Sequence, residues 1–169
     1  MNCRKKFTRW AALAGVLVIA IGMCACASVA PSQGPSVLAV WDLEELSPLA
    51  IPNPHLGNLL AGQIMVHVDA GGRYKVVDRD NLMKILEELQ LGSSELADPG
   101  TRLRLGRIMG AEQMVFGAFQ MVGRMQRVDL RLVDVSTGKI LKTASGTASL
   151  ADLNGWLQAT DQATAELLK

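Results

Sequence analysis

The feature that most constrains the fold is a long alternating segment from Ala111 to Leu141, which reads AEQMVFGAFQMVGRMQRVDLRLVDVSTGKIL. A period of two between apolar and polar residues is that of a β-strand whose two faces meet different surroundings. We predict strands over residues 112–122, 125–135 and 139–148, with Gly138 in a hairpin turn that needs a positive φ. Such a ribbon either crosses a membrane or lies in the sheet of a water-soluble domain.

The residue pattern favours the water-soluble domain. Strands of about ten residues can span a bilayer, but membrane-spanning strands carry aromatic residues at both interfaces. No Trp or Tyr marks the ends of the two strands that flank Gly123. The alternation is explained if one face packs on a core and the other meets water. We expect Val128, Leu130 and Leu132 on the core side, and Arg127, Asp129 and Arg131 on the water side.

The segments before this ribbon predict alternating strands and helices. A continuous apolar run over residues 37–43 indicates a buried strand, and residues 74–78 indicate a second short one. Between them, helical spacing predicts a helix that the pair Gly71–Gly72 ends. Its apolar positions are Leu56, Leu59, Leu60, Ile64 and Val68.

Capping residues predict where three further helices begin. Asp78 is the expected N-cap of a helix through residue 90, with apolar residues at Leu82, Ile85, Leu86 and Leu89. Asp98 and Pro99 begin a short helix that ends before Gly110. Ser149 with Asp152 forms an expected capping box for the final helix, whose apolar positions are Leu153, Trp156, Leu157, Ala163 and Leu167. The order β-α-β-α-α-β-β-β-α predicts an α/β (α+β) fold with a mixed sheet of about five strands and helices packed on it.

The N-terminus has the pattern of an export signal. Arg4, Lys5, Lys6 and Arg9 precede an uncharged apolar run over residues 10–23, which is shorter than the 20 or so residues of a bilayer-spanning helix. The following GMCACAS resembles the lipobox of bacterial lipoproteins. Cys26, preceded by the small Ala25, fits lipidation better than the alternative Cys24. An ordinary signal peptide cut near Ala25 or Ala27 stays open.

These features predict three regions: a lipoprotein signal peptide at 1–25, a lipidated flexible tether at 26–36 and a globular domain at 37–169. The ten residues after Cys26 reach at most about 33 Å. Ala27 stands where an aspartate would retain a lipoprotein at the inner membrane, which predicts anchoring to the periplasmic face of the outer membrane. Removing residues 1–25 takes away four of 17 basic residues and none of 16 acidic ones, leaving a net charge of −3. That charge argues against nucleic-acid binding.

The sequence offers little catalytic chemistry. His55 and His67 have no metal-ligand spacing, no nucleophile motif such as G-x-S-x-G occurs, and no cofactor is expected. We therefore predict a protein that is not an enzyme, with an unrecognised hydrolase as a remote alternative. Arg102, Arg104 and Arg107 form one basic cluster. It is either a solvated helix end or a contact for an acidic partner.

An ordered set of segments resembles a known family. VLAVWDLEELSP, GRYKVVDRDNLMKILEELQLGSS, MGAEQMVFGAFQ and VDLRLVDVSTGKIL resemble the CsgG-like family of curli assembly and transport lipoproteins. Periplasmic domains of the TolB N-terminal and peptidoglycan-synthase-activator kind are similar too. The family's channel builds its membrane-spanning part from two long insertions in the hairpins. Here Val122-Gly123-Arg124-Met125 turns directly from one strand to the next.

The resemblance implies an outer-membrane lipoprotein in the periplasm that assists curli-type assembly or secretion by binding other cell-envelope proteins. Without the insertions, we expect it not to be a pore by itself. An LpoB-like activator of a peptidoglycan synthase is the main alternative, and a full curli-type secretion channel subunit is another. Whether the chain forms a homo-oligomer stays open.

Overall fold

A computed structural model describes residues 34–46, 55–77, 79–89, 96, 98–149 and 152–169. The chain divides into two compact units, Met1–Gly34 and Pro35–Lys169. The fold described below is that of the second unit.

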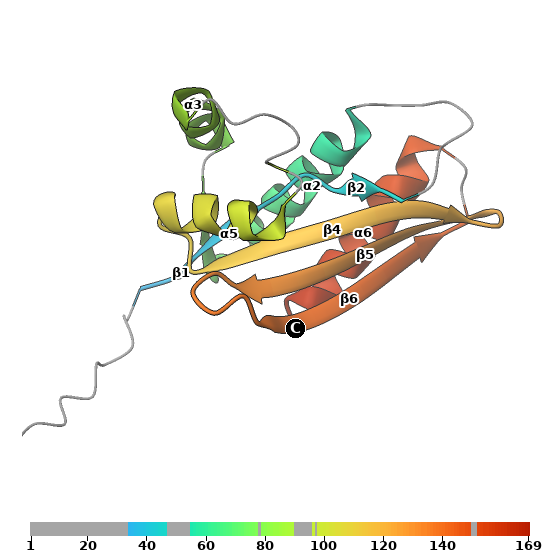
Figure 1. Ribbon diagram of the computed structural model, residues 1–169. Coiled ribbons are helices and arrows are strands. Elements are labelled where there is room, and N and C mark those ends of the chain that lie inside the picture. Colours follow the sequence, from blue (N-terminus) through green and yellow to red (C-terminus); the bar gives the residue numbers. More distant parts are fainter. Residues whose placement is uncertain (1–33, 47–54, 78, 90–95, 97, 150–151) are drawn as a thin grey trace, which may run out of the picture. The chain divides into compact units, whose positions relative to one another are not determined.

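Three long antiparallel strands form one half of the sheet. They are β4 (Gln113–Val122), β5 (Met125–Asp134) and β6 (Ile140–Ala148). Val122 pairs with Met125 across a two-residue turn in which Gly123 has φ 63°. Gly138, with φ 71°, lies in the turn between β5 and β6. All three predicted strands are confirmed to within one residue at each end, and the direct turn at Gly123 is confirmed (Figure 1).

The other half of the sheet is parallel. Strand β1 (Ser36–Val40) lies between β3 (Tyr74–Val76) and β4, and the path of the sheet is β3-β1-β4-β5-β6. The predicted strand over residues 37–43 is shorter than expected, because β1 ends at Val40. A separate two-residue strand that was not predicted, β2 (Glu44–Glu45), follows it and pairs with β4 further along. The predicted mixed sheet is thus confirmed, with six strands.

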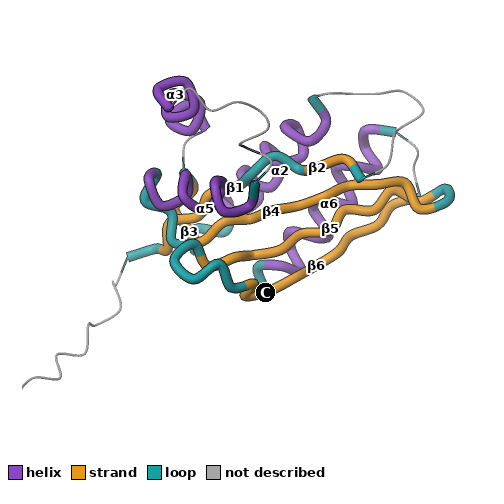
Figure 2. The backbone as a smooth tube through the Cα atoms, in the orientation of Figure 1, coloured by secondary structure: helices purple, strands orange, loops and turns teal. Residues whose placement is uncertain are grey.

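Helices cover the two faces of this sheet unequally (Figures 1 and 2). Helices α2 (Leu56–Ala70) and α6 (Leu153–Leu167) pack on one face, where Phe119 meets Trp156 edge-on at 5.3 Å between ring centroids. Helix α5 (Pro99–Ile108) packs on the opposite face, where Gly106 lies against Met114 and Val135. Helix α3 (Arg79–Leu89) is confirmed as a helix, while its expected cap Asp78 and the side chain of Leu82 lie outside the described residues.

The alternation of β5 follows from this layering. Val128, Leu130 and Leu132 are buried under α2 and α6, whereas Arg127 and Arg131 are exposed on the opposite face and Asp129 is half-buried there. The expected division into a core side and a water side is confirmed. Among the described residues, no helix has the length and apolar character needed to cross a membrane.

The structure corrects three details of the expected helices. The N-cap of α6 is Asp152, whose side chain accepts from Gly155 N at 2.9 Å, so the capping box beginning at Ser149 is wrong. Leu153 is 47% exposed and Leu59 is 43% exposed, so neither belongs to the core. In α2 and α6 the buried stripe is therefore narrower than the apolar spacing predicts. Trp156, Ala163 and the predicted helix end at Gly71–Gly72 are as expected.

Asp98 caps α5 as predicted. Its Oδ2 accepts from Thr101 N at 2.7 Å, and this backbone hydrogen bond is the main reason that the pKa of Asp98 lies below its ordinary value of 3.8. Asp98→Ala should lower the Tm by about 2–4 °C at pH 7, because a helix donor loses its partner. Since the folded-state pKa is lowered, the difference should shrink as the pH falls below about 4. Thermal unfolding at pH 7 and pH 3 checks this. Glu87→Ala, an exposed carboxylate on α3, is the control; an equal loss of Tm in both variants would contradict the capping role.

Candidate functional site

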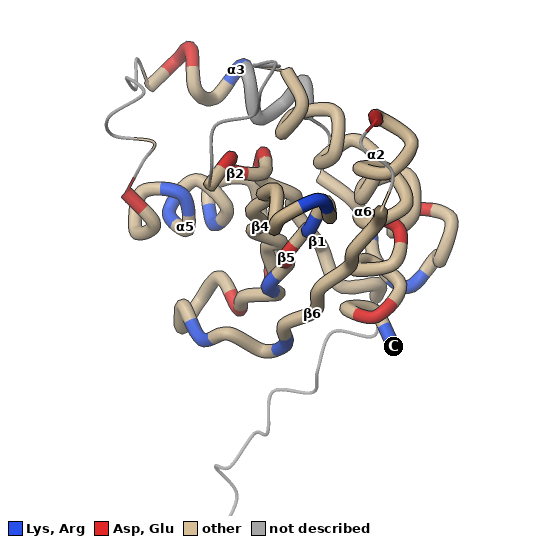
Figure 3. The backbone as a smooth tube through the Cα atoms, turned by 90° about the vertical axis from the view of Figure 1, so that its right-hand side faces the viewer, with Lys and Arg blue, Asp and Glu red and all other residues tan. Residues whose placement is uncertain are grey.

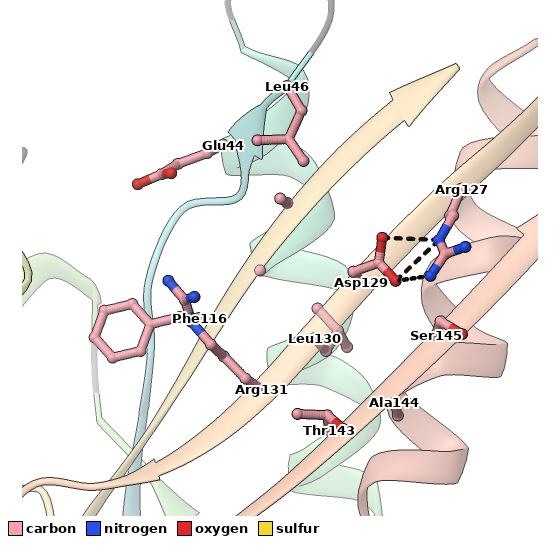
Figure 4. A pocket seen from close by; sticks show the side chains of 12 residues that line it. Glu44, Leu46, Phe116, Arg127, Asp129, Leu130, Arg131, Thr143, Ala144 and Ser145 are labelled. Atoms are coloured by element: carbon pink, nitrogen blue, oxygen red, sulfur yellow. Dashed lines mark hydrogen bonds and ion pairs between the residues drawn. The ribbon is translucent and has the colours of Figure 1, made fainter. Parts of the chain in front are cut away.

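Part of one sheet face carries no helix in the described structure. Helix α5 covers this face only near Met114, Val133 and Val135. Beyond it, the strands β2, β4, β5 and β6 line a groove of about 550 Å³. Its lining residues are Glu44, Leu46, Phe116, Gly117, Ala118, Arg127, Asp129, Leu130, Arg131, Thr143, Ala144 and Ser145 (Figure 4). The groove therefore lies on the water-facing side of the hairpin strands.

Two side chains of β5 form an ion pair at one part of the groove. The Arg127 guanidinium donates through Nε and Nη2 to both carboxylate oxygens of Asp129, at 2.7–3.0 Å. Residues i and i+2 of a strand share a face, so the pair is local to β5. The hydrogen bonds to Asp129 raise the pKa of Arg127. This cation is already neutralised by its neighbour.

Arg131, one step further along the same strand face, has a different environment. Its guanidinium lies 5.7 Å from the ring centroid of Phe116, the residue that pairs with it on β4 (Figure 4). Among the residues that the structure describes, no carboxylate forms an ion pair with Arg131. A cation on an aromatic face is held in place without being neutralised. Arg131 therefore offers its charge to a molecule in the groove.

A third charged contact joins the groove to α5. The Arg102 guanidinium forms an ion pair with Glu44 of β2, donates from Nε to Leu96 O at 2.6 Å and lies 5.7 Å from the Trp41 ring centroid. Arg102 is only 8% exposed. Figure 3 shows the acidic β2 beside the basic α5. Glu44, Arg127 and Asp129 thus have ion-pair partners. Arg131 is the charged residue of the groove lining that forms no ion pair within the described part of the chain.

The predicted arginine cluster does not form one surface patch. Arg102 is buried, and Arg107 donates to the backbone oxygens of Val135 and Ser136 at 3.1 and 3.3 Å. Arg104 is exposed. An acidic partner contact at these three positions stays a prediction, with Arg104 the most accessible of them.

The remaining candidate residues are the cysteines and the histidines. Cys24 and Cys26 lie outside the described residues. His67 Nδ1 lies 3.8 Å from Asp161 Oδ1 on the exposed surface between α2 and α6, and Gln63 donates to the same oxygen at 2.8 Å. Within the described ranges, no three His, Cys, Asp or Glu side chains are placed to hold a metal ion. The groove lining contains neither histidine nor cysteine.

Sequence reasoning placed Arg127, Asp129 and Arg131 on the water side but did not identify them as a site. The pattern R-x-D-x-R on an exposed strand face was the available signal. Glu44 and Phe116 gave no comparable signal, because their place beside Arg131 depends on pairings across distant segments.

Residues 50–127 match the family model described as "Curli production assembly/transport component CsgG". No curated protein sequence matches the chain.

Three solved structures show where this fold occurs. The LpoB C-terminal domain from Salmonella enterica aligns with a TM-score of 0.58 at 17% identity, covering 69% of this chain and 84% of that one. Lipoprotein GNA1162 from Neisseria meningitidis aligns with a TM-score of 0.52 at 17% identity, covering 68% of this chain and 82% of that one. The PelC dodecamer from Paraburkholderia phytofirmans aligns with a TM-score of 0.51 at 20% identity, covering 80% of this chain and 85% of that one. At these identities the similarity concerns the fold.

Proposed function

We propose that this chain, which carries a CsgG family domain with a CsgG/LpoB-like fold, is a non-enzymatic envelope lipoprotein that binds other cell-envelope proteins during assembly or secretion. Lipidation at Cys26, with Cys24 as the alternative, anchors it to the periplasmic face of the outer membrane. The similarity to a protein described as a lipoprotein supports this anchor.

The observation that carries the proposal is the groove on the open sheet face. Its walls combine an aromatic ring, a guanidinium without an ion-pair partner among the described residues, and two hydroxyl groups at Thr143 and Ser145. These groups match an extended segment of a partner protein that carries an acidic side chain. The carboxylate would lie on Arg131, and the chain on either side would contact Phe116 and the hydroxyl groups. Charge-assisted hydrogen bonds of this kind are stronger than neutral ones.

Replacing Arg131 by alanine should weaken partner binding about tenfold, because one charge-assisted contact is lost. The measurement is crosslinking in cells that produce the full chain, with the captured envelope proteins quantified by mass spectrometry. Arg124→Ala, in the turn between β4 and β5 and outside the groove, is the matched control. A partner that is captured equally by the Arg131→Ala and Arg124→Ala variants would contradict the groove as its binding site.

A second role is supported by the fold similarity to LpoB. An activator of an inner-membrane peptidoglycan synthase has to reach across the cell wall, and a tether of at most about 33 Å argues against this. Under this alternative, lengthening residues 27–36 by ten residues should increase synthase activity. Under the leading proposal, the longer tether should leave synthase activity unchanged.

In the leading proposal the chain does not conduct ions by itself, because β4 turns directly into β5. Planar-bilayer recording of the purified protein checks this, and reproducible conductance would favour a channel subunit. A fold neighbour is described as a dodecamer, which supports self-association as a further property to be measured by light scattering.

A further inference from the structure

The start of β1 marks one end of the sheet. Val37 O accepts from Glu112 N at 2.9 Å, and Glu112 O accepts from Val135 N at 3.0 Å. The point where the tether enters the domain therefore lies beside the β5–β6 turn. Figure 1 shows β1, this turn and α5 at the same end of the sheet. We call this the tether end and define it by Ser36, Arg104, Arg107, Ile108, Lys139, Ile140 and Leu141.

Three large apolar side chains are exposed at the tether end. Ile108 is 54% exposed, Ile140 51% and Leu141 47%. Ile108 is the last residue of α5, and the hydrogen bonds of Arg107 to Val135 O and Ser136 O hold this helix end against the turn. Ile140 and Leu141 begin β6 directly after the turn. Single exposed apolar residues are ordinary, but several at one end indicate an interaction surface.

Cations accompany these apolar residues. Arg104 lies one helical turn before Ile108 on the same face of α5, and Lys139 directly precedes Ile140. The two nearby carboxylates, Glu112 and Asp134, accept hydrogen bonds from neutral donors of Ser36, Ser136 and Thr137 and keep their charge. Arg104, Arg107 and Lys139 outnumber them at this end. Apolar residues beside Arg and Lys match the boundary of an anionic lipid surface, where the apolar groups enter and the cations meet the headgroups.

The opposite end of the sheet also exposes apolar residues, namely Val122, Met125 and Leu153. The tether distinguishes the two ends. Ten residues of β4 extend about 33 Å, which equals the greatest reach of the ten residues from Ala27 to Ser36. To bring the far end to the membrane, the tether would have to run fully extended along the whole sheet. The tether end reaches the membrane without that extension.

We infer that the tether end lies on the anionic lipid surface of the membrane that holds the anchor, so that the groove is presented at an orientation set by Ile108, Ile140 and Leu141. This inference rests on the proposed lipid anchor at Cys26 or Cys24.

The test places one reporter at each end of the sheet in the full processed protein. Leu141→Cys and Met125→Cys, at positions 47% and 44% exposed, are labelled with an environment-sensitive fluorophore and reconstituted into vesicles. The vesicles contain phosphatidylethanolamine and phosphatidylglycerol in a ratio of about three to one, with nitroxide-labelled lipid as quencher. Ile140→Cys and Val122→Cys serve as a second matched pair in case a label disturbs folding. Labelling of the unsubstituted protein measures the thiol background.

Quenching should be at least about threefold stronger at Leu141 than at Met125, and the difference should decrease in vesicles without phosphatidylglycerol. Equal quenching at both positions in an acylated protein would overturn the inference and leave the proposed function standing. Mass spectrometry of the N-terminal peptide determines acylation separately. Absence of any acyl chain would overturn both the anchor and the inference.

Discussion

Gly146→Ala is expected to destabilise the domain by about 3 kcal/mol, the upper part of the range for overpacked cores. Gly146 lies in β6, where backbone atoms of α6 pack directly against it. A Cβ atom at this position would overlap Ala159 O and lie 2.8 Å from Ala163 N. Both are backbone atoms of a helix, so no side-chain rotation can relieve the contact. The helix would have to move away from β5 and β6, which would loosen the contact of Trp156 with Phe119.

Denaturant unfolding of the full chain measures this loss, and Gly62→Ala is the matched control. Gly62 lies within α2, and a Cβ there would meet nothing within 4 Å. The same substitution should therefore stabilise the protein by about 0.5–1 kcal/mol through helix propensity. If Gly146→Ala changed stability by less than about 1 kcal/mol, α6 would not approach the sheet as closely as described.

The antiparallel half of the sheet could be predicted closely because its signals are local. A strand with one covered face has a period of two, and β5 shows it over the run from Arg127 to Leu132. Gly123 and Gly138 mark the turns because both adopt a positive φ. Asp98 and Pro99 mark the start of α5 for reasons contained within one helical turn. Each of these predictions depends on neighbouring residues only.

Features set by distant contacts could not be predicted in the same way. Gln126 occupies a core position at 2% exposure, and its Nε2 donates to Asp152 O at the start of α6 at 2.9 Å. The apolar run over residues 37–43 predicts one strand of that length, yet β1 ends at Val40 and the short strand β2 pairs with β4 after it. The requirement for glycine at position 146 arises only when α6 is placed. Sequence periodicity contains none of this information.

The same distinction between local signals and distant contacts applies to the candidate site. The exposed alternation of Arg127, Asp129 and Arg131 was visible in the sequence, but their different roles were not. Arg127 is paired by a residue two positions away, whereas Arg131 depends on Phe116 of the adjacent strand. Similarly, spacing on one helix grouped Arg102 with Arg104 and Arg107. In the structure Arg102 is buried, because its side chain contacts the Trp41 ring and forms an ion pair with Glu44.

Arg102→Ala is expected to destabilise the domain by about 2 kcal/mol. The change removes the ion pair with Glu44, the hydrogen bond to Leu96 O and the contact with the Trp41 ring. Breaking a fully buried ion pair costs about 3–5 kcal/mol, but the Glu44 side chain is 47% exposed and water can solvate the carboxylate that remains. The expected loss for Arg102→Ala is therefore smaller than that for a fully buried pair. Arg104→Ala, on the exposed side of the same helix, should change stability by less than about 0.5 kcal/mol.

A double-mutant cycle with Glu44→Ala separates the contributions. If the ion pair is the main contact, the coupling between the two positions should be about 1 kcal/mol. Arg102→Ala should also weaken partner binding, because an uncompensated Glu44 would oppose the acidic segment expected at Arg131. In that case Glu44→Ala added to Arg102→Ala should restore binding while leaving most of the stability loss in place. Binding that fell in parallel with stability in both variants would instead mean that Arg102 acts on the groove only by holding α5 against the sheet.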